Sequence, residues 1–205
     1  MAFLVAEEYL PATLTARPMT DDQFAAFCAA HSDLFFEMTA EGEIIVMPPT
    51  RSLTGTRNAR ILAQLSAWAE QDGRGTETGS SDGFVLPSGA RRSPDAAWTA
   101  NTRLAELSPQ SLEGFWHLSP DFVIELKSDS DRLPTWRRKM QEWIANGTVL
   151  AWLINPDNQT VEIYRPGRDE AQMLTRAQEI HGEGPVAGFV LDMRRIWNPL
   201  PDKGN

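Results

Sequence analysis

The chain has 205 residues, 41% of them apolar, and it includes seven tryptophans. This length and composition are typical of a folded domain with its own core, and they exclude a disordered chain. The formal net charge of -9 at pH 7 excludes a uniformly basic surface of the kind that binds nucleic acid nonspecifically. We expect one domain over residues 1–198, followed by a flexible tail over residues 199–205.

The sequence predicts a cytoplasmic protein without membrane contact. No stretch approaches the roughly 20 consecutive apolar residues that a membrane helix needs. Glu7 and Glu8 lie where a secretory signal would carry basic residues. Cys28 is the only cysteine in the sequence, so an intrachain disulfide is excluded, and its apolar neighbours predict a buried, inert thiol.

The N-terminal part of the chain is predicted to hold a short helix, a hairpin and a long helix. Thr20-Asp21-Asp22 is typical of the N-cap and acidic first turn of the short helix. Two strands within residues 34–47 predict the hairpin, which Pro48-Pro49 would end. Apolar residues at helical spacing over residues 54–71 predict the long helix, and Gly73 marks its end.

The middle of the chain is predicted to hold two short strands and a long loop. Residues 84–86 form an apolar run that ends at a proline, and residues 94–99 resume an extended pattern after a turn at Gly89. Residues 101–120 show no clear period, so we expect a loop with a helical turn at its centre.

The C-terminal part is predicted to hold a strand, a helix and a hairpin. Residues 121–127 and the strongly apolar residues 149–154 are predicted as strands. Pro134 suits the first turn of a helix between them, which predicts a crossover unit with two parallel strands. Residues 160–164 complete a hairpin with the second strand. The fold class is therefore α/β, with a mixed central β-sheet flanked by helices and an N-terminal β-hairpin.

Two carboxylates and an amine in these strands predict a metal-dependent nuclease site. Side chains alternate between the faces of a strand, so Glu125 and Lys127 are expected to share one face. If Asp95 lies alongside, the two carboxylates and the carbonyl of Leu126 can bind Mg2+ or Mn2+. The ammonium of Lys127 would then position the attacking water for hydrolysis of a phosphodiester bond in DNA.

The same residues also allow an interpretation without chemistry. Glu-x-Lys on a half-exposed strand is ordinarily a solvated pair that contributes about a few tenths of a kcal/mol. However, Glu125 interrupts an apolar run, and Asp95 precedes the apolar residues 96–98. A carboxylate near a core is costly unless a cation pairs with it, so the functional interpretation is favoured.

Basic residues cluster near the predicted site despite the negative net charge. They are Arg91, Arg92, Arg132, Arg137, Arg138 and Lys139. Such a patch predicts weak binding of DNA, because a bound phosphate responds to the local field rather than to the net charge. A solvated helix face is the alternative interpretation.

Several segments of the sequence resemble those of a known family. They are Glu41 to Thr50, Arg92 to Trp98, Pro120 to Ser128, Lys139 to Trp143 and Trp152 to Pro156. In their order and spacing they resemble the Uma-two family of restriction endonucleases, a branch of the PD-(D/E)XK nuclease superfamily. The resemblance implies a restriction-endonuclease-like fold, with a small mixed sheet between helices and a metal held by Asp95 and Glu125.

The resemblance leaves part of the ligand set open. Ser128-Asp129-Ser130-Asp131 departs from the Ser-Pro-Ser that is common in the family. Members of the superfamily frequently recruit a further acid or amide from another element. Glu37, Glu43 and Asn58 are the candidates in this chain, and the sequence does not choose among them.

Other classes of function fit the sequence less well. A catalytically silent binding or assembly module with the same fold is the main alternative. Glycoside hydrolysis would use the carboxylate pair but leaves the neighbouring lysine without a role. Trp136, Trp143 and Trp152 are expected to pack in the core rather than to stack on bases. A homodimer is a further expectation, with a contact near Glu162 or residues 189–191.

Overall fold

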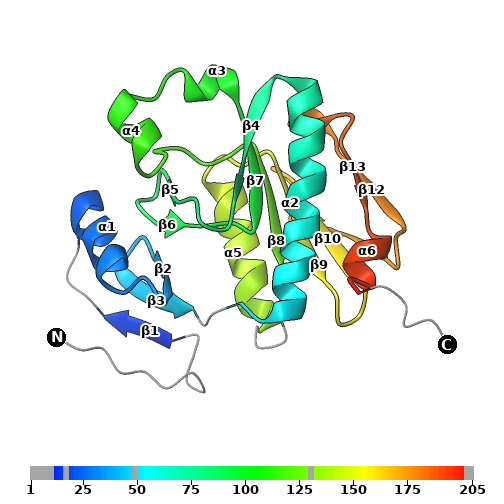
Figure 1. Cartoon of the computed structure of the whole chain (residues 1–205), viewed down its shortest axis with the longest axis horizontal. Coiled ribbons are helices and arrows are strands. Elements are labelled where there is room, and N and C mark those ends of the chain that lie inside the picture. Colours follow the sequence, from blue (N-terminus) through cyan, green and yellow to red (C-terminus); the bar gives the residue numbers. More distant parts are fainter. Residues whose placement is uncertain (1–11, 16–18, 48–49, 129–131, 201–205) are drawn as a thin grey trace.

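A six-stranded mixed sheet forms the centre of the computed structural model (Figure 1). The structure describes residues 12–15, 19–47, 50–128 and 132–200. The strands lie in the order β11, β10, β9, β8, β7 and β4. Their bounds are Gly75–Gly79 for β4, Ala96–Ala100 for β7, Phe122–Leu126 for β8, Leu150–Asn155 for β9, Thr160–Tyr164 for β10 and Gln172–Thr175 for β11. Strands β8 and β9 are parallel, and the other neighbours are antiparallel.

Helix α5 explains the parallel pairing. It spans Leu133–Ala145 and connects β8 to β9, which confirms the predicted crossover unit. Pro134 lies in its first turn, where the missing N–H has no helical partner to lose. Trp136, Met140 and Trp143 recur at helical spacing and are buried against one face of the sheet.

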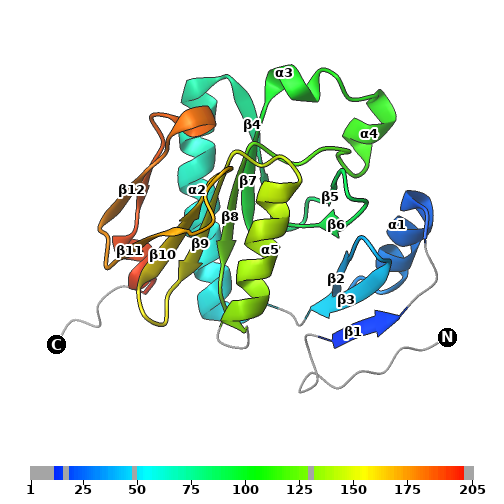
Figure 2. The same cartoon turned by 180° about the vertical axis from the view of Figure 1, so that it is seen from behind.

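Helix α2 covers the opposite face of the sheet. It spans Ser52–Asp72 and ends at Gly73, whose φ of 68° lies in the left-handed region that favours glycine. Figure 1 shows α2 in front of the sheet, and Figure 2 shows α5 in front of it from behind. Phe122 and Ile124 of β8 pack in the α2 cluster, whereas Glu125 faces α5. This alternation confirms the predicted strand period.

A five-stranded sheet with the N-terminal hairpin lies beside the central one (Figure 1). Its strands, in spatial order, are β1 (Ala12–Thr15), β3 (Glu43–Met47), β2 (Phe35–Met38), β6 (Arg91–Arg92) and β5 (Phe84–Val85). Strands β2 and β3 pair as predicted. Helix α1, Asp21–Ala30, packs on this sheet through Phe24 and begins at Thr20, which forms a capping box. The pairing of Met38 with Arg91 joins the hairpin to the segment before Asp95.

Several short elements were not predicted from the sequence. Besides β1, β4, β6 and β11, they are α3 (Asn101–Leu104), β12 (Glu179–His181), a 3-10 turn (Gly184–Val186), β13 (Val190–Asp192) and α6 (Arg194–Trp197), whereas α4 (Pro109–Glu113) is the helical turn predicted at the centre of the loop. The sequence of β4 is Gly-Thr-Glu-Thr-Gly, which lacks the apolar alternation of a strand. Its strand conformation depends on pairing with β7. Local sequence therefore carries no signal for this edge of the sheet.

The structure also bears on the expectations for the ends of the chain and for Cys28. Residues 48–49 and 201–205 lie outside the described residues. At residue 199 the backbone is tied to α2, because Arg60 Nη2 donates to the Pro199 carbonyl oxygen at 2.7 Å. Cys28 is half-buried, and burial raises the pKa of its thiol. Among the described helices, none is long and apolar enough to cross a membrane.

We predict that Gly75→Ala destabilises the fold by about 1–3 kcal/mol through overpacking. A Cβ at Gly75 would lie 2.3 Å from the Trp98 ring and 2.5 Å from the Thr99 carbonyl oxygen, both in β7. Gly55→Ala in α2 is the matched control, because its Cβ would meet only Thr50 Cγ2, at 3.8 Å, and alanine favours a helix. Urea unfolding measures both variants. Equal stability of the two would contradict the close packing of β4 on β7.

Candidate active site

Asp95 and Glu125 lie next to each other where antiparallel strands β7 and β8 meet. Ala96 pairs with Ile124, so Asp95, immediately before β7, is adjacent to Glu125. The backbone N–H of Leu126 donates to Asp95 Oδ2 at 2.7 Å, which fixes this carboxylate against β8. Glu125 itself is only 1% exposed. The structure therefore brings the two predicted acids together.

The amine beside these acids comes from helix α5. Lys139 Nζ lies 2.8 Å from Glu125 Oε1 and 2.8 Å from Glu37 Oε1. It also donates to the Ser93 carbonyl oxygen at 3.3 Å. The three acceptors match the three protons of an ammonium. The sequence placed Lys139 in the basic cluster but gave it no role, although its spacing from the buried Trp136 puts it on the inner face of the helix.

Lys127 is the residue that follows β8, and its ammonium binds groups other than Glu125. Its Nζ donates to Asp157 Oδ2 at 2.7 Å and to the Ser128 carbonyl oxygen at 2.9 Å. Asp157 belongs to the turn between β9 and β10. The role of Lys127 in positioning water stays a prediction, whereas the contact with Glu125 is made by Lys139.

Glu37 is a third carboxylate of the site and comes from the N-terminal hairpin. Its Oε1 accepts the backbone N–H of Ser93 at 3.1 Å, and its Oε2 accepts Arg92 Nη1 at 3.1 Å. Arg92 in turn forms two hydrogen bonds with Glu142 of α5, at 2.7 and 3.1 Å. This network joins strand β2, strand β6 and helix α5 around the segment that leads to Asp95.

Two of the three residues that the sequence left open contact the site. Glu37 binds the ammonium described above. Asn58 of α2 donates from Nδ2 to Asp95 Oδ1 at 2.6 Å. Glu43, in contrast, is exposed on β3. Only the tertiary structure makes this distinction, because all three are polar residues far from Asp95 and Glu125 in the sequence.

The buried charges shift one another's pKa values. Burial raises the pKa of Glu125 to about 8; Lys139 opposes the shift, and Asp95 and Glu37 add to it. Burial would also raise the pKa of Glu37, but Lys139 and Arg92 outweigh it and lower that pKa. Burial would lower the pKa of Lys139, but Glu125 and Glu37 outweigh it and raise that pKa above its ordinary value. Lys139 therefore stays protonated, and Glu125 readily takes up a proton or a cation.

The predicted core tryptophans are buried. Trp136 is 9%, Trp143 0% and Trp152 1% exposed. Trp143 also serves the site, because its Nε1 donates to Glu125 Oε1 at 2.9 Å. This bond partly offsets the cost of burying a carboxylate. The Trp143 side chain therefore both packs in the core and forms a hydrogen bond with the site.

Most of the predicted basic cluster is used inside the fold. Arg91 and Arg92 are 7% and 8% exposed, and both pair with carboxylates. Arg137 is held by a buried glutamate of β10 at 2.9 and 3.0 Å. Arg132, at the N-cap of α5, and Arg138, in the middle of this helix, are exposed. Arg137 is exposed as well, although it is bound to the glutamate of β10.

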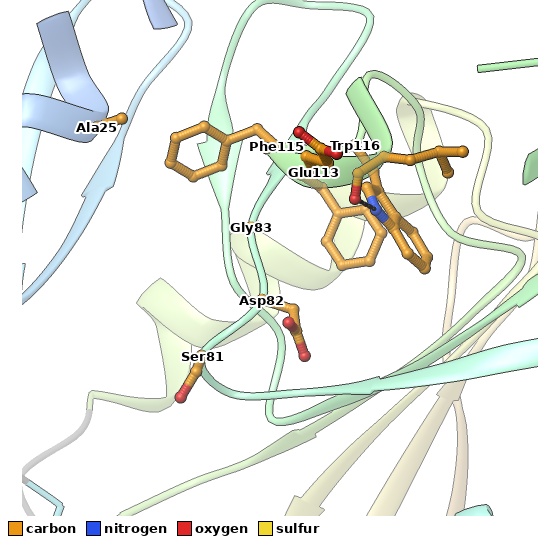
Figure 3. Close-up of a pocket in the computed structure, with 10 residues that line it drawn as sticks. Ala25, Ser81, Asp82, Gly83, Glu113, Phe115 and Trp116 are labelled. Atoms are coloured by element: carbon orange, nitrogen blue, oxygen red, sulfur yellow. Dashed lines mark hydrogen bonds between the residues drawn. The ribbon is translucent and has the colours of Figure 1, made fainter. Parts of the chain in front are cut away.

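An open pocket of 440 Å³ lies apart from the acids (Figure 3). It is lined by Ala25 of α1, residues 81–84 and residues 112–116. Figure 3 shows the Phe115 ring projecting toward α1. The two acids of the pocket, Asp82 and Glu113, are exposed. The pocket lacks the buried, mutually constrained ionisable groups that are typical of catalytic sites, so we place the candidate chemistry at Glu125.

The chain belongs to the Uma2 family, whose model is described as "Putative restriction endonuclease" and matches residues 21–194. The match includes both acids at the ends of β7 and β8 and also Glu37 and Lys139. The resemblance that the sequence segments indicated is therefore confirmed.

A solved structure is similar to this chain over most of its length. It is the crystal structure of a putative nuclease belonging to DUF820 from Anabaena variabilis ATCC 29413, with a TM-score of 0.69 and 19% sequence identity. The match covers 88% of this chain and 98% of that chain. It confirms the mixed α/β fold. A comparison with curated proteins found no match.

We predict that Glu125 makes the stability of the protein decrease as pH rises. Its pKa of about 8 in the folded chain lies above the ordinary 4.5, so its stabilising contribution is complete below about pH 4.5 and is lost as pH rises through 8. Glu125→Gln should remove up to about 1.4 kcal/mol per pH unit from the slope of unfolding free energy against pH in this window. Urea unfolding between pH 5 and 9 measures it, with the exposed Glu113→Gln as control. Identical slopes for wild type and Glu125→Gln would contradict the shift.

Proposed function

We propose that the chain is a metal-dependent endonuclease that hydrolyses phosphodiester bonds in DNA. The observation that carries this proposal is that Asp95 and Lys139 both lie next to the buried carboxyl group of Glu125. Membership of the Uma2 family supports the same class of reaction. We assign the metal to Asp95, Glu125 and the carbonyl of Leu126, and the amine function to Lys139 in place of Lys127.

The chemistry of the donor set fits a hard divalent cation. Carboxylate and carbonyl oxygens are the ligands that Mg2+ and Mn2+ prefer. Two cationic side chains, Arg92 and Lys139, face the three carboxyl groups of Glu37, Glu125 and Glu142. Asp95 adds a negative charge that raises the pKa of Glu125. A bound cation would relieve the repulsion between these acids. Among the described residues, no group of three or more acidic, histidine or cysteine side chains is arranged to hold a metal, so oxygens of other kinds must complete the site.

The residues of the chain have separate tasks in this proposal. A bound cation supplies polarisation of the phosphate and stabilises negative charge on its oxygens. Lys139 keeps its proton, so it does not act as a base, and a cation bound to Glu125 would release one N–H of the ammonium from that carboxylate to orient the attacking water. Glu37 and the Ser93 carbonyl hold that ammonium in place. Asp95 contributes negative charge that attracts the cation, and Glu125, whose pKa is about 8, would lose its proton when the cation binds.

The approach of DNA is assigned to the first half of α5. Arg132 and Arg138 are exposed there, on the helix that also carries Lys139. With so few free cationic groups from the predicted cluster and a net charge of -9, binding of bulk DNA should be weak and sensitive to salt. Positioning by the metal and the acids would then contribute more than general electrostatic attraction.

A catalytically silent module is the second candidate, and one observation favours it. Lys139 binds both Glu37 and Glu125 directly, which already compensates part of the buried negative charge. Titration with Mn2+ separates the two functions. Saturable binding that is lost when Asp95 and Glu125 are replaced together supports the nuclease, whereas no binding at millimolar metal supports the silent module.

We predict that Asp95→Asn and Glu125→Gln each abolish Mg2+-dependent cleavage of plasmid DNA. Both replacements keep the shape of the side chain and remove the negative charge that the cation needs. Thermal unfolding should remain cooperative in both variants. Cleavage that persists in both would refute the assignment of the metal ligands. The exposed Glu113→Gln serves as the control and should cleave as wild type does.

We predict that Lys139→Ala lowers the cleavage rate by about 100-fold or more, the usual effect of removing a donor to the reacting oxygens. Lys127→Ala should stay within a few-fold of wild type, because its ammonium binds Asp157. Cleavage rates and melting temperatures are measured for both variants, and Lys139→Arg tests whether charge alone suffices. If Lys127→Ala is inactive while Lys139→Ala retains its activity, the water-positioning role belongs to Lys127.

A further inference from the structure

Asn58 on helix α2 presents a partly buried amide to Asp95. Its Nδ2 donates to Asp95 Oδ1 at 2.6 Å. Its Oδ1 is buried and has no hydrogen-bond partner among the described residues. The reverse orientation of the amide would set two oxygens against each other, so the donation by Nδ2 is the favoured assignment. A buried acceptor without a partner beside an acidic site requires an explanation.

Covalent geometry places this oxygen within reach of a shared ion. The nitrogen and oxygen of an amide are bonded to one carbon, so they are at most about 2.5 Å apart. Asn58 Oδ1 therefore lies within about 5 Å of Asp95 Oδ1. Two oxygens bound to one Mg2+ are separated by up to about 4 Å. A small side-chain rotation is enough to bring both oxygens to the same cation.

Other polar side chains at the site are less suited to this task. Both oxygens of Glu37 already accept from cationic or backbone donors. Glu142 is bound through both oxygens to Arg92. Asn58 Oδ1, in contrast, is a buried oxygen that accepts no hydrogen bond from the described residues.

We propose that Asn58 Oδ1 is a further ligand of the divalent cation, so that α2 completes a site begun by Asp95 and Glu125. This inference rests on the proposed function. It assigns two tasks to one amide, since Nδ2 holds Asp95 while Oδ1 faces the cation. It also explains how a site with two acids gains a third side-chain oxygen without further negative charge.

The test compares Asn58→Ala with Asn58→Asp by calorimetric titration with Mn2+ and by the shift in melting temperature that Mn2+ causes. Asn58→Ala removes the ligand and should weaken Mn2+ binding about tenfold or more. Asn58→Asp keeps an oxygen there but places it against Asp95. This variant should therefore melt lower without metal, yet bind Mn2+ at least as tightly as wild type and show a larger metal-induced shift.

A matched control is Gln64→Ala, which removes a partly buried amide from the same helix. Gln64 bonds to the backbone of Asp192, away from the acids, so this variant should lose stability but keep wild-type Mn2+ affinity. If Asn58→Asp binds Mn2+ as weakly as Asn58→Ala, the residue only positions Asp95, and the ligand assignment is overturned.

Different results would overturn the proposed function and the assignment of Asn58. Wild type that binds no Mn2+ at millimolar concentration overturns the proposed function, and the role of Asn58 with it. Wild-type binding that is lost in Glu125→Gln but unchanged in Asn58→Ala overturns the Asn58 assignment alone. Binding that weakens in Asn58→Ala and is retained in Asn58→Asp supports both.

Discussion

The buried contact between the Lys139 ammonium and the Glu125 carboxyl group is the interaction on which the site depends. A carboxylate that is 1% exposed is costly to ionise, and an ammonium in the same place is equally costly without acceptors. Each reduces the cost of the other, and Trp143 and the Ser93 carbonyl supply further hydrogen bonds. Because Lys139 also binds Glu37, one ammonium joins helix α5, the central sheet and the N-terminal hairpin.

This arrangement makes the N-terminal sheet part of the site. Strand β6 pairs with the hairpin on one side and leads directly to the segment of Asp95 on the other. Arg92 of that strand holds Glu37 and Glu142 at once, so the smaller sheet and α5 are fixed relative to each other. A carboxylate from the hairpin can therefore act at a site whose principal acids lie on the central sheet.

The distribution of charge explains how an acidic chain can belong to a family of nuclease-like proteins. The arginines near the acids mostly neutralise carboxylates within the fold, as Arg91, Arg92 and Arg137 do. For the proposed nuclease, a net charge of -9 predicts little general affinity of the surface for a polyanion. Any activity on DNA has to come from local groups at the site and from a bound cation, whose charge changes the balance there.

The sequence by itself determined the crossover unit around α5, the long helix α2 and the N-terminal hairpin, because these follow from local periods of 2.0 and 3.6 residues, whereas the pairing of the two acids was set by the register of β7 on β8. Short strands such as β4 escaped prediction because their partners, not their own residues, hold them in the sheet. Only the tertiary structure decided that Lys139 and not Lys127 contacts Glu125, and that Glu37 and Asn58 join the acids while Glu43 does not. Those contacts join distant segments, and no local period of the sequence encodes them.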